Sequence, residues 1–150
     1  MRLADILLPD RVTVQLVAED KPSALRGLAR LLVTPDGPDE ESIAQVFEQR
    51  EALASTGVGS GVAIPHGRMH GADELRAAVG ICTGGVDFDA IDGRPAYILV
   101  AVLGPIAKTG EHLKALARFS RVLRRAPVRE QLLAASSAAA AFEIILEADQ

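Results

Sequence analysis

The run AYILVAVL, residues 96–103, is the longest uninterrupted apolar stretch in the chain. Its eight residues are too few to cross a membrane, which takes roughly 20 apolar residues in a helix. They do match the length of a buried β-strand. A second, largely apolar run of strand length occupies 77–82. Because strands that are apolar on both faces are usually covered by helices on both faces, these runs predict a sheet enclosed between helical layers.

Helical patterns occur before and after the two apolar runs. Asp20 is placed to cap a helix whose apolar residues continue to Leu32, and a second helix is predicted over 38–54. The remaining predicted elements are strands over 11–17 and 62–64, a loop over 57–61, a helix over 109–125, and shorter helices over 128–135 and 137–147. This order predicts an α/β layered fold with a small, mostly covered sheet.

The composition excludes several classes of protein. The chain has 150 residues, 49% of them apolar and 24% charged, which predicts one globular domain over 1–150. Its net charge of −4 argues against nucleic acid as a partner. The first residues lack the long apolar core of a signal peptide, and Cys82, the only cysteine, cannot form an internal disulfide. We therefore expect a cytoplasmic protein with no segment inserted in a membrane.

The predicted helix over 38–54 carries a charged residue in the middle of its apolar face. Ile43, Val46 and Phe47 set that face, and at about 100° per residue Arg50 falls at its centre. An arginine is rarely buried without a partner. Arg50 therefore either extends its guanidinium to solvent near the helix end or points at an anion.

The predicted helix over 109–125 begins its apolar stripe with a histidine. His112, Leu116, Phe119 and Leu123 follow one another at spacings of four, three and four. Thr109 is a candidate N-cap, which places His112 at the third helical position. A helix start favours anions and disfavours a protonated imidazole. His112 is then a neutral donor to an anion, or alternatively a histidine at the edge of the core that donates to a carbonyl group.

The segment GVGSGVAIPHGR, residues 57–68, presents another histidine. Pro65 keeps Ile64 extended, so the strand continues to the proline and His66 follows at its end. Gly67 has no side chain and can adopt left-handed backbone angles, which leaves the surroundings of His66 open. The three glycines before the strand allow a close approach, and their N–H groups could bind an anion. The alternative is a glycine-rich turn with an incidental histidine.

Together, His66, His112 and Arg50 are suited to carrying a phosphoryl group on a histidine. The ordinary pKa of about 6.5 leaves His66 largely neutral at cytosolic pH, and a neutral imidazole is a nucleophile. His112 and Arg50 would offset the charge of the transferring group. Because the sequence contains no P-loop, kinase glycine-rich loop or clear carboxylate cage for magnesium, the expected donor is another phosphoprotein. His70 lies in a polar segment and is expected to be exposed and incidental.

Three segments resemble the enzyme IIA domains of the bacterial phosphotransferase system. They are REALASTGVGSGVAIPHGR (50–68), FDAIDGRPAYILVAVLGP (88–105) and EHLKALARFSRVL (111–123). The first resembles the Gly-x-Gly-x-Gly-[Ile/Val]-Ala-[Ile/Val]-Pro-His-Gly signature of the fructose/mannitol class, most closely its nitrogen-related branch. The resemblance extends over nearly the whole chain. It implies an α/β layered sandwich with a small mixed β-sheet covered by helices on both faces.

The resemblance also implies roles for individual residues. His66 matches the histidine that the phosphocarrier protein of the system phosphorylates, and His112 matches the second histidine, which supports the phosphohistidine without being phosphorylated. Arg50 matches the arginine near the phosphate, and Ser60 and Gly67 complete the candidate phosphate-binding set. Ser60 departs from the family, whose members carry Glu, Asp, Asn or Gln there. Its shorter hydroxyl has less reach toward His66.

The resemblance to the nitrogen-related branch implies a regulatory protein whose phosphorylation state changes which partners bind. Two alternatives stay open. One is a transport enzyme IIA that passes its phosphate to a separate sugar-specific IIB protein, and the other is a binding module that keeps the fold but takes no phosphate. A metal site on His66 and His112 lacks an obvious third ligand, and no cofactor is expected.

Overall fold

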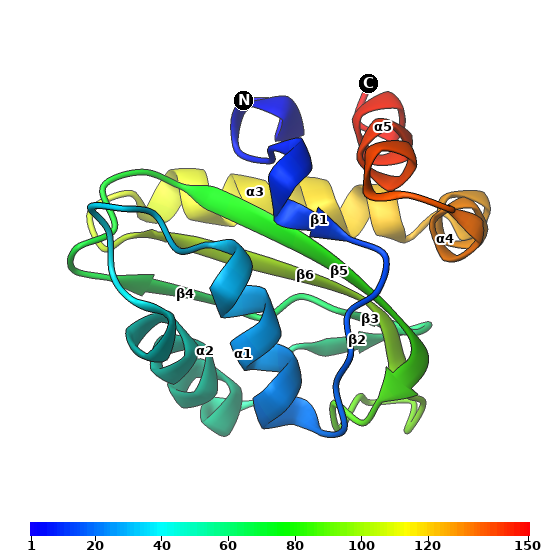
Figure 1. The fold of residues 1–150 in the computed structure, drawn as a ribbon, viewed down its shortest axis with the longest axis horizontal. Helices are drawn as coiled ribbons and strands as arrows, with labels where there is room; N and C mark the ends of the chain where they lie inside the picture. Colours follow the sequence, from blue (N-terminus) through cyan, green and yellow to red (C-terminus); the bar gives the residue numbers. More distant parts are fainter.

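The chain, described over residues 1–150 by a computed structural model, forms an open mixed sheet of six strands with helices packed on both faces (Figure 1). The strands are β1 (Val12–Thr13), β2 (Gly57–Gly59), β3 (Val62–Ala63), β4 (His66–Met69), β5 (Arg76–Val86) and β6 (Ala96–Pro105). The α-helices are α1 (Lys21–Leu31), α2 (Glu40–Leu53), α3 (Thr109–Leu123), α4 (Ala126–Ala134) and α5 (Ala138–Ala148). None of these helices is both long enough and apolar enough to span a membrane.

The two long strands β5 and β6 form the centre of the sheet. They pair antiparallel, β1 runs parallel to the outer side of β5, and β2 pairs antiparallel with β3. Both β3 and β4 run parallel to β6, one after the other along the same edge. The predicted mixed sheet is therefore confirmed, with β6 as the strand that positions both β3 and β4.

Two apolar cores lie on opposite faces of the sheet. On β6, Ile98, Val100 and Val102 belong to one core, whereas Leu99 and Ala101 belong to the other. Residues of α3, α4, α5 and the N-terminal segment complete the first core, and residues of α1 and α2 complete the second. Figure 1 shows these two groups of helices on the two sides of the sheet. The alternation along β6 explains why both its faces are apolar and confirms the predicted helical layers.

Side-chain caps fix the starts of three helices. Asp20 accepts the backbone N–H of Ser23 at 2.9 Å at the start of α1, as the sequence predicted. Asp39 accepts the N–H of Ser42 at 2.8 Å at the start of α2, and Ser137 caps α5 in the same way. Each cap satisfies one of the N–H groups that a helix start leaves without an internal partner.

The predicted strand over 11–17 was too long. Only β1 is regular, and the chain then leaves the strand. Val12 packs in the core with α3, whereas Leu16 packs in the core with α1. The chain therefore crosses from one face of the sheet to the other between them, which ends the regular strand.

The predicted loop over 57–61 and the polar segment after Pro65 both contain strands. β2 and β3 form a tight hairpin with an irregularity in its register. Ser60 lies in the turn with a φ of 57°, between two glycines that also have positive φ. β4 follows Pro65 and pairs with the second half of β6. Glycine-rich and polar composition concealed both strands, because short strands at a sheet edge need few apolar residues.

Candidate functional site

A cavity of about 490 Å³ opens between α2, β4 and the start of α3. Two histidines and two arginines line it, and no carboxylate does; they are His66, His112, Arg50 and Arg68. The other lining residues are Val46, Gln49, Leu53, Gly67, Ile106, Thr109, Leu113 and Leu116. The cavity suits an anion because its positive charges are not neutralised by acidic neighbours within the lining.

His66 is the first residue of β4, aligned with Val102 of β6, so the strand end that the sequence predicted before it is followed directly by a second strand. Two backbone hydrogen bonds hold the residues that lead to it. The carbonyl of Pro65 accepts the N–H of Val102 at 3.0 Å, and the N–H of Ile64 donates to the carbonyl of Thr56 at 2.9 Å. The proline thus separates two strands along one edge and fixes the start of the second.

The ring of His66 is oriented by a backbone carbonyl. Its Nδ1 lies 2.8 Å from the carbonyl oxygen of Ile64. Because a carbonyl only accepts hydrogen bonds, Nδ1 of the neutral ring carries the proton and Nε2 keeps its lone pair. Burial lowers the pKa of His66 below its ordinary value and the charge of Arg50 lowers it further, against the opposing effects of the Ile64 hydrogen bond and Glu51. The ring of the half-buried His66 is therefore neutral at pH 7, with the lone pair on Nε2.

His112 faces His66 from α3. Their ring centres are 5.6 Å apart, and the ring planes are tilted by 56°. His112 is 4% exposed, and its Nδ1 is buried without a hydrogen-bond partner. Burial, followed by the charges of His66 and Arg68, lowers the pKa of His112 to about 4. The ring is therefore neutral at pH 7, as the sequence analysis expected of a donor to an anion.

The predicted position of His112 within its helix needs one correction. Lys108, not Thr109, is the N-cap of α3, which makes His112 the fourth helical residue. Its own N–H already donates to the carbonyl of Lys108 at 3.1 Å. The free N–H groups of the helix start therefore lie before His112, and its contribution to the cavity is its ring.

Arg50 enters the cavity from the last turn of α2. Its Nη1 donates to the carbonyl of Ala54 at 2.9 Å, and Arg50 is only partly exposed. The buried face of the helix is formed by Ile43, Phe47 and Glu51 among others, so Arg50 flanks this face and does not lie at its centre. The guanidinium is held near the helix end and also lines the cavity.

Arg68 is a cavity residue that the sequence analysis did not single out. It lies two residues after His66 on β4, and alternate residues of a strand share a face. Its Nη1 donates to the carbonyl of Ile106 at 3.2 Å and to the hydroxyl of Thr109, which ties β4 to the start of α3. The spacing of two from His66 was the available signal, but it becomes visible only once β4 is recognised as a strand.

Gly67 lies between these two residues and lines the same cavity. A Cβ atom at this position would overlap with Cγ1 of Val46 on α2. Gly67 does not have a positive φ, so the left-handed freedom expected from the sequence is not used. Glycine is needed here because α2 approaches the backbone of β4 closely.

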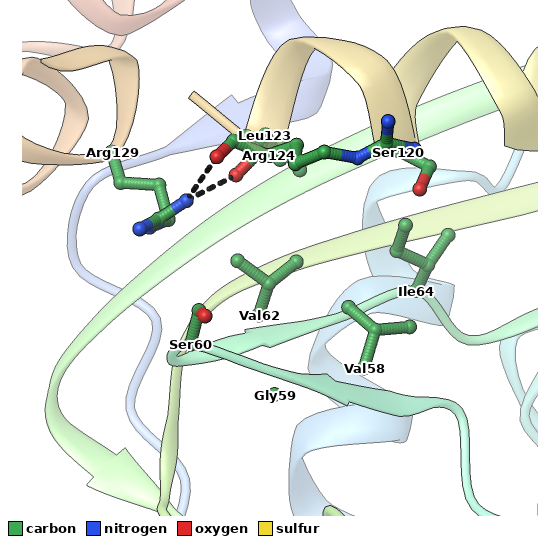
Figure 2. A pocket seen from close by; sticks show the side chains of 9 residues that line it. All are labelled: Val58, Gly59, Ser60, Val62, Ile64, Ser120, Leu123, Arg124 and Arg129. Carbon is green, nitrogen blue, oxygen red and sulfur yellow. Dashed lines mark hydrogen bonds between the residues drawn. The ribbon is translucent and has the colours of Figure 1, made fainter. Parts of the chain in front are cut away.

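Ser60 lies in a different cavity, of about 190 Å³, between the β2–β3 turn and the end of α3 (Figure 2). Its backbone N–H donates to Oδ2 of Asp92 at 2.9 Å. Neither histidine lines this cavity, whose residues are Val58, Gly59, Ser60, Val62, Ile64, Ser120, Leu123, Arg124 and Arg129. The structure therefore brings His66, His112 and Arg50 together but leaves Ser60 apart from them.

The third histidine is outside both cavities. His70 follows β4, is exposed, and does not line either of them. This matches the exposed position expected from the sequence. No group of three or more histidine, cysteine, aspartate or glutamate side chains is arranged to hold a metal ion.

Residues 5–148 match the family model described as phosphoenolpyruvate-dependent sugar phosphotransferase system, EIIA 2. A nitrogen regulatory protein from Pseudomonas aeruginosa is 39% identical over 149 residues, covering 98% of this chain and 96% of that protein. The crystal structure of nitrogen regulatory protein IIA-Ntr from Neisseria meningitidis has a TM-score of 0.90 at 31% identity, covering 95% and 98% of the two chains. A fructose-specific EIIA component from Haloferax volcanii is 36% identical over 109 residues, covering 73% and 71%. The resemblance drawn from three segments is confirmed.

Proposed function

The chain belongs to the EIIA 2 family of the phosphoenolpyruvate-dependent sugar phosphotransferase system, and from that membership we propose that His66 accepts a phosphoryl group from a histidine-containing phosphocarrier protein. The observation that carries the proposal is the hydrogen bond of 2.8 Å between Nδ1 of His66 and the carbonyl of Ile64, which leaves Nε2 as the nucleophile. The cavity around this nitrogen holds two arginines and a second histidine, and no carboxylate lines it.

The transfer is a substitution at phosphorus between two imidazoles. The lone pair on Nε2 of His66 attacks the phosphoryl group, and the Nε2–P bond forms as the N–P bond of the carrier breaks. The electron pair of the broken bond returns to the imidazole of the carrier. The proton on Nδ1 stays in its hydrogen bond to Ile64, so His66 needs no general base, and the phosphoryl oxygens offset the charge of the phosphorylated ring.

The other cavity residues act on the charge of the transferring group. Arg50 and Arg68 each use Nη1 for contacts within the protein, which leaves their other donors for phosphoryl oxygens. His112, neutral because of its lowered pKa, offers one N–H donor. Since His112 is almost fully buried and His66 is half-buried, an incoming carrier reaches His66 first.

We infer further that phosphorylation controls the binding of partner proteins. Three exposed apolar residues border the cavity: Leu53 is 82% exposed, Leu113 is 59% exposed and Ile106 is 44% exposed. Apolar surface of this kind beside a reactive site is typical of protein docking. A phosphoryl group adds a charge of about −2 at its centre, which changes the partners that fit. The similarity to nitrogen regulatory proteins supports this regulatory role.

Transport is the second candidate role. It is favoured by the similarity to the fructose-specific EIIA component, and it would require that phosphate passes from His66 to a separate IIB protein and then to a sugar. A binding module that takes no phosphate is the least favoured alternative, because His66, His112 and Arg50 meet in one cavity.

The mass of the intact protein tests the phosphoryl transfer. After incubation with phosphoenolpyruvate, enzyme I and the phosphocarrier protein, the wild type is expected to gain one phosphoryl group that mild acid removes. His66→Ala is expected to gain none, and His70→Ala, which changes an exposed histidine outside the cavity, is expected to label like the wild type. No gain in the wild type with a cognate carrier would overturn the proposal.

A second measurement separates the two roles. The labelled protein is mixed with a sugar-specific IIB protein and its sugar, and the phosphate is followed. Passage to the sugar would establish transport. A regulatory protein instead keeps its label under these conditions and binds a partner with a Kd that differs between the phosphorylated and unphosphorylated forms.

A further inference from the structure

Glu51, beside Arg50 on α2, is a buried acidic residue that the transfer scheme does not use. It is 8% exposed. Its Oε1 accepts the backbone N–H of Thr56 at 2.9 Å, and its Oε2 accepts the hydroxyl of the same residue. Nζ of Lys21 lies 3.1 Å from Oε1 and supplies a countercharge. Three donors therefore hold this carboxylate in one orientation inside the protein.

A series of hydrogen bonds leads from Glu51 to the ring of His66. The carbonyl of Thr56, whose N–H and hydroxyl Glu51 holds, accepts the N–H of Ile64 at 2.9 Å. The carbonyl of Ile64 in turn accepts from Nδ1 of His66 at 2.8 Å. Every member of the series belongs to the segment 50–68, and only the imidazole lines the cavity with the two arginines.

We propose that Glu51 is a positioning residue for His66: by fixing Thr56, it holds the Ile64 carbonyl where that carbonyl selects the Nδ1–H tautomer and leaves Nε2 free to attack. The inference rests on the proposed phosphoryl transfer and adds a residue to it. Glu51 does not line the cavity and does not contact the transferring group. It positions the ring through Thr56 and Ile64, and its charge separately opposes the lowering of the pKa of His66.

The other hydrogen bonds near His66 do not replace the contact between Glu51 and Thr56. Val102 of β6 donates to the carbonyl of Pro65 at 3.0 Å after Ile64, and the pairing of β3 with β6 fixes the chain up to Ala63, but neither contact holds the N–H of Ile64 itself. On the other side, the N–H of Ile64 depends on Thr56. The hydroxyl of Ser55 donates to the carbonyl of Phe88 and so holds the neighbouring residue, without contacting the polar side chain of Thr56.

Loss of the carboxylate would leave two donors of Thr56 without partners. Thr56 is 4% exposed, so both donors lie largely shielded from bulk solvent. Because a buried, unpaired donor is costly, we expect Thr56 to move toward solvent and its carbonyl to move with it. The Ile64 carbonyl then loses its fixed direction, and the ring of His66 loses the contact that distinguishes Nδ1 from Nε2.

Four variants test the proposal. Glu51→Ala removes both contacts to Thr56, and Glu51→Gln is the conservative variant that keeps one carbonyl oxygen. Thr56→Val removes the hydroxyl but keeps the backbone N–H. Glu48→Ala is the matched control, because Glu48 is an exposed carboxylate one turn earlier on α2.

The direct readout is the 15N NMR spectrum of the His66 imidazole in the unphosphorylated protein, which distinguishes the two tautomers. The wild type and Glu48→Ala are expected to hold the Nδ1–H form, and Glu51→Ala is expected to show a mixture of the two tautomers.

The kcat for phosphoryl transfer from the carrier is expected to fall roughly 10- to 100-fold in Glu51→Ala, the size of effect that a misplaced reactive group produces. KM is expected to change less than about threefold, because the docking surface is intact. Glu51→Gln is expected to recover part of both losses.

A folded Glu51→Ala protein with the wild-type tautomer and the wild-type kcat would overturn the positioning role. If Glu51→Ala does not fold, Thr56→Val decides by the same two readouts: a shift in the tautomer with a lower kcat supports the role, and no change in either overturns it. Failure of the wild type to accept phosphate would overturn the proposed function instead. In that event the NMR comparison alone still decides whether Glu51 sets the tautomer of His66.

Discussion

Two neighbouring cavities along α3 differ in how their polar groups are satisfied. In the cavity of Figure 2, Nη1 of Arg129 donates to the last carbonyls of α3, at 2.9 Å to Leu123 and at 2.8 Å to Arg124. In the cavity that contains His66, Nδ1 of His112 is buried without a partner. The first cavity is a place where the end of a helix is completed, whereas the second is lined by two arginines and two histidines with no carboxylate to neutralise them.

A hollow in the surface therefore does not by itself identify a functional site. Arg129 lies where the helix carbonyls favour a cation, and its contacts are structural. Arg50 and Arg68 line a space that also holds two neutral histidines and no acid. Positive charge that is not neutralised, beside a nucleophile kept neutral by burial, is what indicates phosphoryl chemistry.

The largest difference between the two cavities is expected when an arginine in each is replaced. Arg50→Gln is expected to lower kcat/KM for phosphorylation roughly 100- to 1,000-fold, because it removes a donor that offsets charge on the transferring group. Arg124→Gln, in the other cavity, is expected to change kcat/KM less than about twofold. Rapid-quench measurements with the phosphocarrier protein compare the two. Equal losses in both variants would mean that the cavities do not differ in function.

His112 is expected to make the free energy of unfolding depend on pH. Its pKa is about 4 in the folded protein, below the ordinary value of 6.5, so between these pH values the unfolded chain binds a proton that the folded protein does not. The free energy of unfolding is therefore expected to fall as pH decreases from 6.5 to 4, and to regain this contribution as pH rises. We expect about 2 kcal/mol from His112 after solvent screening, with His66 acting in the same direction.

The measurement is urea unfolding at several pH values for the wild type and His112→Gln. The variant is expected to lose less stability over this window, and His70→Ala is expected to behave like the wild type. A His112→Gln protein with the full pH dependence would show that His112 is not held neutral. The same variant is expected to accept phosphate on His66 more slowly while still becoming labelled.

Gly67 tests whether close packing of α2 on β4 shapes the cavity. Gly67→Ala is expected to lower the free energy of unfolding by about 1–3 kcal/mol, because the added methyl group overlaps with Val46. Gly84→Ala is the matched control, since a Cβ at that position in β5 meets no atom within 4 Å. Chemical unfolding of both variants compares them. Equal stability would contradict the account of why glycine follows His66.

The smallest effect is expected at Ser60. Because Ser60 lies in the cavity of Figure 2 and its N–H is bound to Asp92, Ser60→Ala is expected to change the rate of phosphorylation less than about twofold. A large loss of rate would mean that the two cavities act together, and it would return Ser60 to the phosphate-binding set that the sequence suggested.

The sequence predicted the centre of the fold well and its edges poorly. The runs at 77–82 and 96–103 are apolar on both faces, so they indicated central strands and two helical layers without further information. β2 and β4 are short edge strands built from glycine and polar residues, and their pairing depends on β3 and β6. Local composition carries little information about such strands because their partners come from elsewhere in the chain.

The residues of the candidate site were likewise predicted only in part. His66, His112 and Arg50 were found because each departs from a local apolar pattern. Arg68 was missed because its significance depends on β4. Glu51 was missed because the residue that explains its burial, Thr56, meets it only after α2 has ended. These contacts follow from tertiary structure, which the spacing of residues in the sequence does not specify.

The nitrogen to which phosphorus is bonded shows whether Nε2 of His66 accepts the phosphoryl group. The protein, labelled with 15N in its histidines, is phosphorylated by the phosphocarrier protein, and the coupling between 31P and the imidazole nitrogens is measured by NMR. We expect the one-bond coupling at Nε2 of His66, with the proton retained on Nδ1. A phosphoryl group on Nδ1 of His66, or on either of the other two histidines, would contradict the role assigned to the Ile64 carbonyl and to the cavity it faces.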